Sequence, residues 1–367
     1  MKQMTLRRLK GVGLSVLTAA ALCLVLPKLS ADAQATDAGK CGKYYTYAAQ
    51  GGLFVQRTAS GAATEIVKPS KYYSVDSCVM DNTTIYYATM NASRSKVRVY
   101  RIKPDGTSKK KLVELSGQNT VLQGISGNSL VYTYESSKDP ERVHTRRYSL
   151  TNKRTYKVRN NFSGKQFLGK QVIGTSEDDR VAPGDLYTVG GETGSWFRIS
   201  RSCLDYQVIG KKIYYIECTN KDIGRNRITA VKSCDRNGDN IKTLATNIKN
   251  VDIDEMVPTD KGVYYTCTAE RRVYGYEYKS QSKKVMIDNL SDGNYVLDYM
   301  SGKILVQDPT QTEDPTFTNT IYTIVPGKSG SVKEAELESE FIFFVSGKTY
   351  YAEHTQTDVV RLGRLSR

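Results

Sequence analysis

Short runs of Tyr, Ile, Val and Thr alternate with polar turn residues along most of this chain. Residues 81–112 show the pattern well, with strand-like runs at 85–89 and 97–102, the tight turn Pro104-Asp105-Gly106, and a short strand-like run at 109–112. β-branched and aromatic residues favour half-buried strands. In the turn, Pro presets φ and Gly accepts a positive φ. From residue 41 onward there is no helical heptad and no Pro/Ser-rich linker, so the pattern predicts an all-β fold.

An aromatic or aliphatic pair recurs at a steady spacing of 40 to 50 residues. The pairs are Tyr44-Tyr45, Tyr86-Tyr87, Val131-Tyr132, Val172-Ile173, Tyr214-Tyr215, Tyr264-Tyr265, Ile304-Leu305 and Tyr350-Tyr351. Four-stranded propeller blades repeat at about 40–50 residues. We therefore predict a β-propeller of repeated four-stranded antiparallel blades. Counting three strands in the first unit, four in each of six units and three in the last favours eight or seven blades. Six blades would require some copies to merge.

The turn signature also recurs, because Asp235-Arg236-Asn237-Gly238 follows a strand-like run as Pro104-Asp105-Gly106 does. The residues 85–89, 100–107 and 109–112 together resemble the β-propeller repeat of the low-density-lipoprotein-receptor-related proteins, most closely its bacterial, functionally uncharacterised branch. The receptor repeat has Tyr-Trp-Thr-Asp where this chain has Tyr86-Tyr87-Ala88-Thr89. The resemblance, over roughly residues 40–365, implies the propeller fold but not a receptor-type ligand.

The first 33 residues read as an export signal. Lys2, Arg7, Arg8 and Lys10 precede an apolar run, and Ala31-Asp32-Ala33 is a small-x-small cleavage site. We expect a signal peptide at 1–33, a short linker at 34–40 and a single propeller domain at 41–367, in a bacterial protein that is secreted or held at the cell surface. An uncleaved anchor is the alternative. No later stretch reaches the length of about 18 apolar residues that a membrane span needs.

The chain is basic, with a formal net charge of +15, which falls to +11 when residues 1–33 are removed. In an exported protein such a charge favours anionic neighbours, such as a cell-wall polymer or an acidic polysaccharide. An unidentified protein is the other partner we expect. No nucleic-acid module is recognisable, so nucleic acid is not an expected partner. The alternative is a lysine-rich surface whose charged edge strands only prevent sheets from pairing.

Six cysteines remain after loss of Cys23, and they allow 15 pairings. If Gly210-Lys211 is a two-residue turn, Ile209 faces Lys212, and counting outward places Cys203 opposite Cys218. This register predicts a disulfide between them, with Cys218–Cys234 as a competing pair. No Cys-x-x-Cys motif occurs, which disfavours a zinc ribbon or a thioredoxin-like site.

Residues for catalysis are few, so we expect no enzyme, no catalytic or metal site and no cofactor. The two histidines have no partner at motif spacing, and no nucleophile elbow, zinc motif or phosphate loop occurs. The ligand-face candidates are Asp178 and Asp179 in an irregular stretch, the single Trp196, and Tyr274 and Tyr276. Residues 235–240 could supply calcium ligands, but a turn explains them better.

These features predict a secreted or cell-surface propeller that acts as a non-catalytic binding or protein-interaction module, at the cell envelope. One alternative is an extracellular carbohydrate-active enzyme that uses acids between residues 175 and 200, which would need two carboxylates at a defined separation. A structural scaffold of an envelope assembly is a further alternative.

Overall fold

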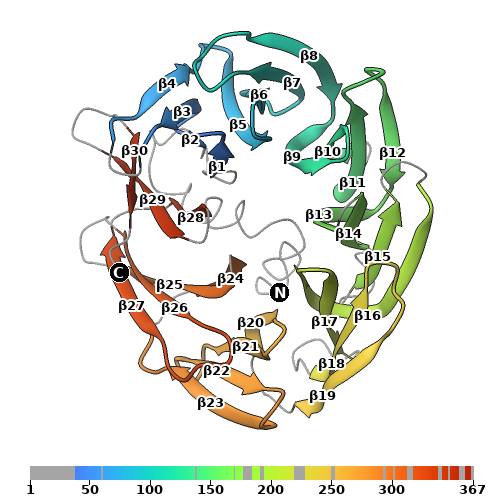
Figure 1. Ribbon diagram of the computed structural model, residues 1–367, viewed down its shortest axis with the longest axis vertical. Helices are drawn as coiled ribbons and strands as arrows, with labels where there is room; N and C mark the ends of the chain where they lie inside the picture. Colours follow the sequence, from blue (N-terminus) through green and yellow to red (C-terminus); the bar gives the residue numbers. More distant parts are fainter. Residues whose placement is uncertain are drawn as a thin grey trace. The chain divides into compact units, whose positions relative to one another are not determined.

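The computed structural model describes residues 38–58, 61–136, 139–168, 170–176, 184–190, 194–218, 228–248, 253–291, 295–300, 302–311, 317–337, 341–345, 348–354 and 360–364. Within these ranges the regular structure is entirely β, with thirty strands that pair antiparallel (Figure 1). They fall into two compact units. No helix in the described ranges is long and apolar enough to cross a membrane.

The first unit contains three four-stranded sheets, β1–β4, β5–β8 and β9–β12, and the three-stranded sheet β28–β30. Its strand β1 lies against β28. The bounds are β1 (Ala38–Cys41), β2 (Tyr44–Ala49), β3 (Gly52–Gln56), β4 (Thr64–Val67), β5 (Tyr73–Met80), β6 (Ile85–Asn91), β7 (Lys96–Ile102), β8 (Lys110–Ser116), β9 (Gln118–Ser126), β10 (Ser129–Ser136), β11 (Asp139–Ser149), β12 (Thr155–Arg159), β28 (Phe341–Val345), β29 (Lys348–His354) and β30 (Val360–Arg364).

The second unit contains the sheets β20–β23 and β24–β27 and nearly all of the seven-stranded sheet β13–β19, whose first strand spans the boundary at Gln166. The bounds are β13 (Phe162–Leu168), β14 (Gln171–Ser176), β15 (Gly184–Gly190), β16 (Trp196–Ile209), β17 (Lys212–Cys218), β18 (Ile228–Asp235), β19 (Lys242–Ile248), β20 (Ile253–Pro258), β21 (Gly262–Cys267), β22 (Arg272–Glu277), β23 (Ser282–Ile287), β24 (Val296–Met300), β25 (Lys303–Gln311), β26 (Phe317–Ile324) and β27 (Val332–Leu337).

The strand β16 belongs to two blades. Its first part, from Trp196 to Ser200, pairs with β15, and its last part, from Tyr206 to Ile209, pairs with β17. When the seven-stranded sheet is divided there, the described strands form eight blades, and only the last blade has three strands. The eight residue pairs of the sequence repeat all fall on second strands, namely β2, β6, β10, β14, β17, β21, β25 and β29. The predicted propeller repeat is therefore confirmed.

The expectation that the first blade has three strands is wrong. Its first strand is present, because β1 begins at Ala38 and pairs with β2 through Cys41 and Tyr44. This strand also includes Ala38, Gly39 and Lys40, the last three residues of the segment 34–40. The count of thirty strands still holds, because the shared strand β16 offsets the extra strand at the start.

The two turns that suggested the repeat have the same hydrogen bonds. Gly106 N–H donates to Lys103 O and Gly238 N–H donates to Asp235 O, both at 2.9 Å. The glycines have φ of 81° and 83°, a conformation that side chains with a Cβ disfavour. The stretch from Asp235 is thus a turn in the described structure, where no cluster of three potential metal-binding side chains occurs.

The predicted disulfide is wrong because the register slips. Between β16 and β17 Cys203 lies opposite Glu217, whereas Tyr206 lies opposite Tyr215, so β16 has one extra residue in between. This β-bulge moves Cys203 away from Cys218, which lies opposite Ile228. The competing pair fails too, because Cys234 lies opposite Ile213. The six cysteines of the described residues are all buried, and none of them is in a disulfide.

The described core is packed between neighbouring sheets. One cluster joins β5–β8 to β9–β12 and includes Val97, Val99, Leu122 and Tyr148. Tyrosines of the second strands are fully buried at Tyr87, Tyr215, Tyr264 and Tyr265. Burying such a ring stabilises the fold by roughly 1.5–3 kcal/mol, which explains why the repeat is visible in the sequence as tyrosine pairs.

Candidate functional site

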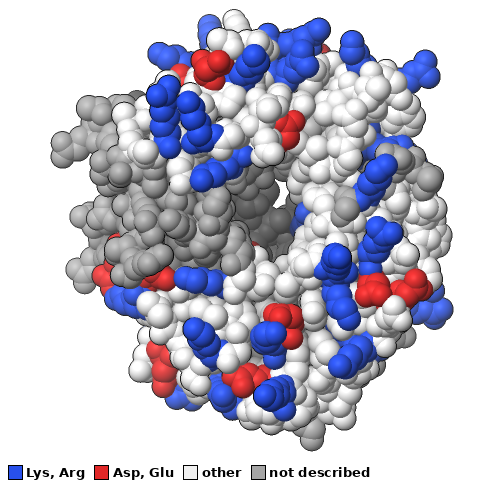
Figure 2. Space-filling model, viewed as in Figure 1, with Lys and Arg blue, Asp and Glu red and all other residues white. Residues whose placement is uncertain are grey.

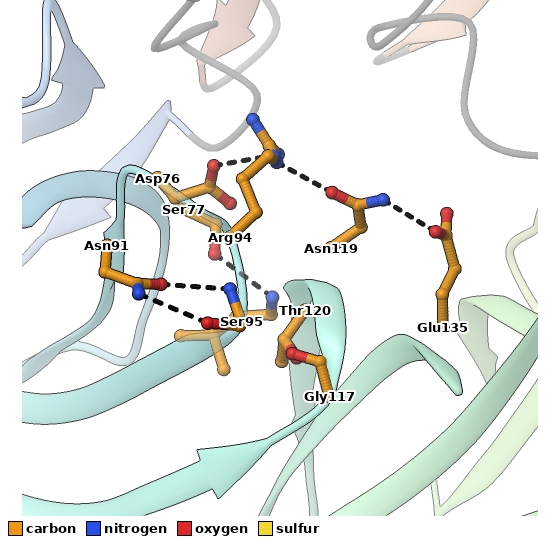
Figure 3. Close-up of polar contacts among 10 residues, drawn as sticks. Asp76, Ser77, Asn91, Arg94, Ser95, Gly117, Asn119, Thr120 and Glu135 are labelled. Atoms are coloured by element: carbon orange, nitrogen blue, oxygen red, sulfur yellow. Dashed lines mark hydrogen bonds and ion pairs between the residues drawn. The ribbon is translucent and has the colours of Figure 1, made fainter. Parts of the chain in front are cut away.

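A chain of polar side chains links the sheets β5–β8 and β9–β12 of the first unit. It runs from Asp76 through Arg94 and Asn119 to Glu135, and Figure 3 shows the four side chains in this order. The start of β5 lies beside the end of β6, and the start of β9 lies beside the end of β10. The antiparallel order therefore brings positions that are up to 59 residues apart to the same ends of their strands.

Asp76 owes its position to a β-bulge. Val75 lies opposite Thr89 and Ser77 lies opposite Ala88, which leaves Asp76 as the extra residue of β5. Bulges redirect side chains and are frequent beside functional sites. The next residue, Ser77, is fully buried, and its hydroxyl accepts a hydrogen bond from Leu122 N–H at 3.1 Å. This bond fixes β5 against β9 just behind the polar chain.

Arg94 is presented by the loop between β6 and β7. The side chain of Asn91 shapes this loop, because its Oδ1 accepts hydrogen bonds from the N–H groups of Ser95 and Lys96, each at 2.9 Å. Arg94 itself has φ of 54°, a strained conformation for a residue with a side chain. The guanidinium meets Asp76 Oδ1 at 3.3 Å and Asn119 Oδ1 at 2.7 Å.

Asn119 also has a positive φ, of 48°, and its Nδ2 donates to Glu135 Oε2 at 2.6 Å. The residue Gly117 allows the chain to enter β9 beneath the ring of Tyr134. A Cβ at position 117 would lie 2.6 Å from Tyr134 Cδ2, and φ there is 151°. The site therefore combines three unusual backbone conformations with a bulge, a concentration that is typical of functional sites.

Both carboxyl groups of the polar chain are pushed toward the protonated form. Burial raises the pKa of Asp76, and the charge of Arg94 opposes this shift. Burial also raises the pKa of Glu135, against the hydrogen bond from Asn119 and the more distant charge of Arg94. Asp76 has 14% of its side chain exposed and Arg94 has 37%. Raised carboxyl pKa values near an accessible cation are a recognised mark of acid–base sites.

The arrangement has the components of general acid–base chemistry. Asp76 contacts the guanidinium directly, which favours its carboxylate form and opposes the effect of burial on its pKa. Glu135 receives its hydrogen bond from a neutral amide, and among the described residues its Oε1 has no partner. A protonated carboxyl can donate a proton, and an ionised one can accept a proton or attack an electrophilic carbon. In addition, the partly exposed guanidinium can bind an anionic or hydroxylated substituent.

Of the ligand-face residues that the sequence predicts, Trp196, Tyr274 and Tyr276 lie on strands that do not form this site. Asp178 and Asp179 lie outside the described residues. Trp196 begins β16 and is 57% exposed, and its ring system makes a T-shaped contact with the ring of Tyr187. Tyr274 is not on a loop, as we had expected, but lies buried within β22. Tyr276 is a half-buried residue of the same strand, and its hydroxyl donates to Gln281 Oε1.

The sequence contains one signal for the site. The loop Asn91-Ala92-Ser93-Arg94-Ser95 has an Asn whose short amide can bond the backbone, and it places an arginine at the loop's apex. The partners of this arginine could not be assigned, since no pattern within a blade relates Asp76 or Glu135 to it.

Comparison with known proteins shows the fold. No family model matches the sequence, and no curated protein matches it. Oligopeptidase B from Leishmania major is similar at 9% identity and a TM-score of 0.55, covering 82% of this chain and 49% of that one. A prolyl endopeptidase is similar at 11% identity and a TM-score of 0.51, covering 82% and 48%. The β-propeller domain of the Trilobed protease from Pyrococcus furiosus shares 12% identity at a TM-score of 0.47, covering 81% and 94%.

The chain therefore has a β-propeller fold and spans about half the length of the two peptidases. The particular receptor-related family is not confirmed. The expectation of a non-catalytic binding module is corrected, because the structures to which the chain is similar include peptidases. Likeness at about 10% identity shows the fold and does not establish an enzyme activity for this chain.

Proposed function

We propose that this chain is a polysaccharide-cleaving enzyme in which Glu135 and Asp76 form the acid–base pair. The observation that supports this proposal most directly is the pair of carboxyl groups whose pKa values are raised by burial and that are joined through Arg94 and Asn119. Glycoside hydrolysis needs two carboxyl groups with different protonation at one site.

In the proposed reaction the protonated Glu135 donates its proton to the glycosidic oxygen as the carbon–oxygen bond breaks. The ionised Asp76 takes a proton from the water that attacks the sugar carbon, so that one water molecule is added across the bond. Arg94 orients the sugar through a hydroxyl or an acidic substituent, since more than a third of its side chain is exposed while it holds Asp76.

The test measures reducing ends released from a panel of polysaccharides by the wild-type protein, Asp76→Asn, Glu135→Gln and Glu114→Gln. Glu114 is a matched control, an exposed acid on β8 of the same unit that pairs with Arg98 and Lys111. We expect turnover to fall about 100-fold or more in the two site variants and to be unchanged in the control. Thermal unfolding verifies that each variant folds. Wild-type protein that cleaves no polysaccharide, or site variants that keep full turnover, would contradict the proposal.

An exported enzyme meets polysaccharides outside the cell, and the signal-like residues 1–33 favour export. These residues lie outside the described part of the chain. Expression of the full chain in a bacterium should yield protein in the culture medium or on the cell surface, with an N-terminus near residue 34. An intact N-terminus inside the cell would contradict this part of the proposal.

A further inference from the structure

Positive charge is concentrated in one part of the chain. Residues 38–165 contain 22 Lys and Arg against 8 Asp and Glu, a net charge of +14, whereas residues 166–339 contain 22 against 25, a net charge of −3. Much of the excess lies on the last two strands of two neighbouring sheets, which are β7 and β8 in the sheet β5–β8 and β11 and β12 in the sheet β9–β12. We call these four the outer strands. Figure 2 shows Lys and Arg gathered over β7 and β8 at its top edge, with few acids among them.

The outer strands of these two sheets touch each other. The hydroxyl of Tyr148 on β11 donates to Leu112 O on β8 at 3.1 Å. In the register of each sheet Arg101 lies opposite Lys110, and Arg146 lies opposite Lys157. Residues that are two positions apart in a strand have their side chains on the same face of the sheet. Arg101 therefore shares the face of Val99, and Arg146 shares the face of Tyr148. Both of these apolar residues belong to the core cluster between the two sheets.

The register therefore places four cations on the facing sides of the two sheets, at the outer rim of their contact. We call Arg101, Lys110, Arg146 and Lys157 the basic junction. Among the described residues none of the four has an ion-pair partner, although Arg146 donates to the hydroxyl of Tyr134 at 3.0 Å. The opposite face of β7 and β8 differs, because there Arg98 and Lys111 share Glu114. Cations that are close together without acids repel one another, and a bound polyanion relieves that repulsion.

The aromatic rings around the basic junction indicate which kind of polyanion the surface can bind. Each has a cation of the chain itself over its ring: Arg146 over Tyr134 at 5.7 Å, Arg147 over Tyr156 at 4.9 Å and Lys109 over Tyr100 at 5.5 Å. Tyr100 is also stacked on Tyr87. Proteins that bind single-stranded nucleic acid stack bases on free aromatic faces, which these rings do not offer. The surface suits a polymer with anionic groups and no bases.

We propose that the basic junction binds an anionic polysaccharide chain. Its cations come from four strands of two sheets, and adjacent strands are about 4.8 Å apart, so the charges are spread along a surface and not gathered at one point. Such a spread fits the repeated carboxylates or phosphates of a polymer better than a single small anion. The binding depends on these cations and not on Asp76 or Glu135, so it can exist whether or not the chain cleaves sugars.

The experiment measures binding of alginate, a carboxylated polysaccharide, to the full chain at several salt concentrations, with neutral dextran and a single-stranded DNA oligonucleotide as comparison probes. The test variant is Arg101→Glu with Lys110→Glu. The matched control is Lys242→Glu with Lys328→Glu, which makes the same charge change at two exposed lysines of the second unit. Circular dichroism verifies that both variants are folded.

We expect alginate affinity to fall about tenfold or more in the test variant and much less in the control, because local charge dominates binding at moderate salt. Wild-type binding should weaken as salt rises and dextran should not bind. Equal losses in the two variants, undiminished binding in the test variant, or tighter binding of the oligonucleotide than of alginate would overturn the proposal. Loss of alginate binding with intact turnover of a neutral polysaccharide would separate this surface from the proposed active site.

Discussion

The cores of the two compact units resemble each other, whereas their surfaces differ in charge. Tyr87 in the first unit and Tyr215 in the second occupy equivalent positions on second strands, both fully buried. Each packs in a cluster with buried cysteines, Cys41 and Cys78 in one case and Cys203 and Cys234 in the other. Burial raises the pKa of both hydroxyls. In contrast, the segment 38–165 has a net charge of +14 and the segment 166–339 one of −3.

The hydrogen bonds that link neighbouring blades also differ between the units. In the first unit the hydroxyl of Ser77 accepts Leu122 N–H from the next sheet, beside the chain from Asp76 to Glu135. In the second unit Gln166 Oε1 accepts Val208 N–H at 2.6 Å. The repeat thus specifies strands, turns and buried rings, whereas the links between blades and the outer charges are free to differ. Function is to be sought where the copies diverge.

The largest expected effect tests whether the two cores are equivalent. Replacing Tyr87 or Tyr215 with Ala should lower the free energy of unfolding by about 3–5 kcal/mol in each case, because a large buried ring is lost. The control is Tyr→Phe at the same positions. It removes a hydroxyl that has no hydrogen-bond partner among the described residues, so stability should stay the same or rise by about 1 kcal/mol. Chemical denaturation measures both. Clearly unequal losses at the two positions would break the comparison.

A smaller loss of stability is expected when the hydrogen bonds that link neighbouring blades are removed. Ser77→Ala leaves the N–H of Leu122 without its partner in a buried place and should cost about 2 kcal/mol. Gln166→Ala removes an acceptor in a partly buried place and should cost about 1 kcal/mol. In chemical denaturation we expect Ser77→Ala to lose more unfolding free energy than Gln166→Ala. The reverse order would contradict the assigned burial.

The smallest effect concerns pH. Asp298 on β24 has its pKa raised by burial alone, unlike Asp76, whose shift Arg94 opposes. A carboxyl with a raised pKa binds more protons in the folded state, so its contribution to stability is full below its ordinary pKa and is lost as pH rises through the folded value. Asp298→Asn should therefore be more stable than wild type at neutral pH and equal to it below about pH 3.8. Unfolding measured across this range tests the prediction, and a gap that widens toward low pH would refute it.

The fold could be predicted from the sequence because each blade repeats the same local chemistry. Tyrosine pairs mark the second strands, and the Gly106 and Gly238 turns are readable from single residues. The bulges could not be predicted, since one extra residue in β16 leaves no mark in the sequence and yet moves Cys203 off register. The site could not be predicted for the same reason, because the bulge at Asp76 and the contact with Glu135 depend on which strands lie side by side.

The continuity of β16 limits how the number of blades can change. At the junctions of the first unit, residues outside any strand separate one sheet from the next, as at residues 68–72 between β4 and β5. In β16 a single strand of 14 residues serves two blades. A recombination event that gains or loses one blade needs a joint that can be cut without breaking a ladder of hydrogen bonds. The blades on either side of Cys203 lack such a joint, so we expect them to be inherited as a pair.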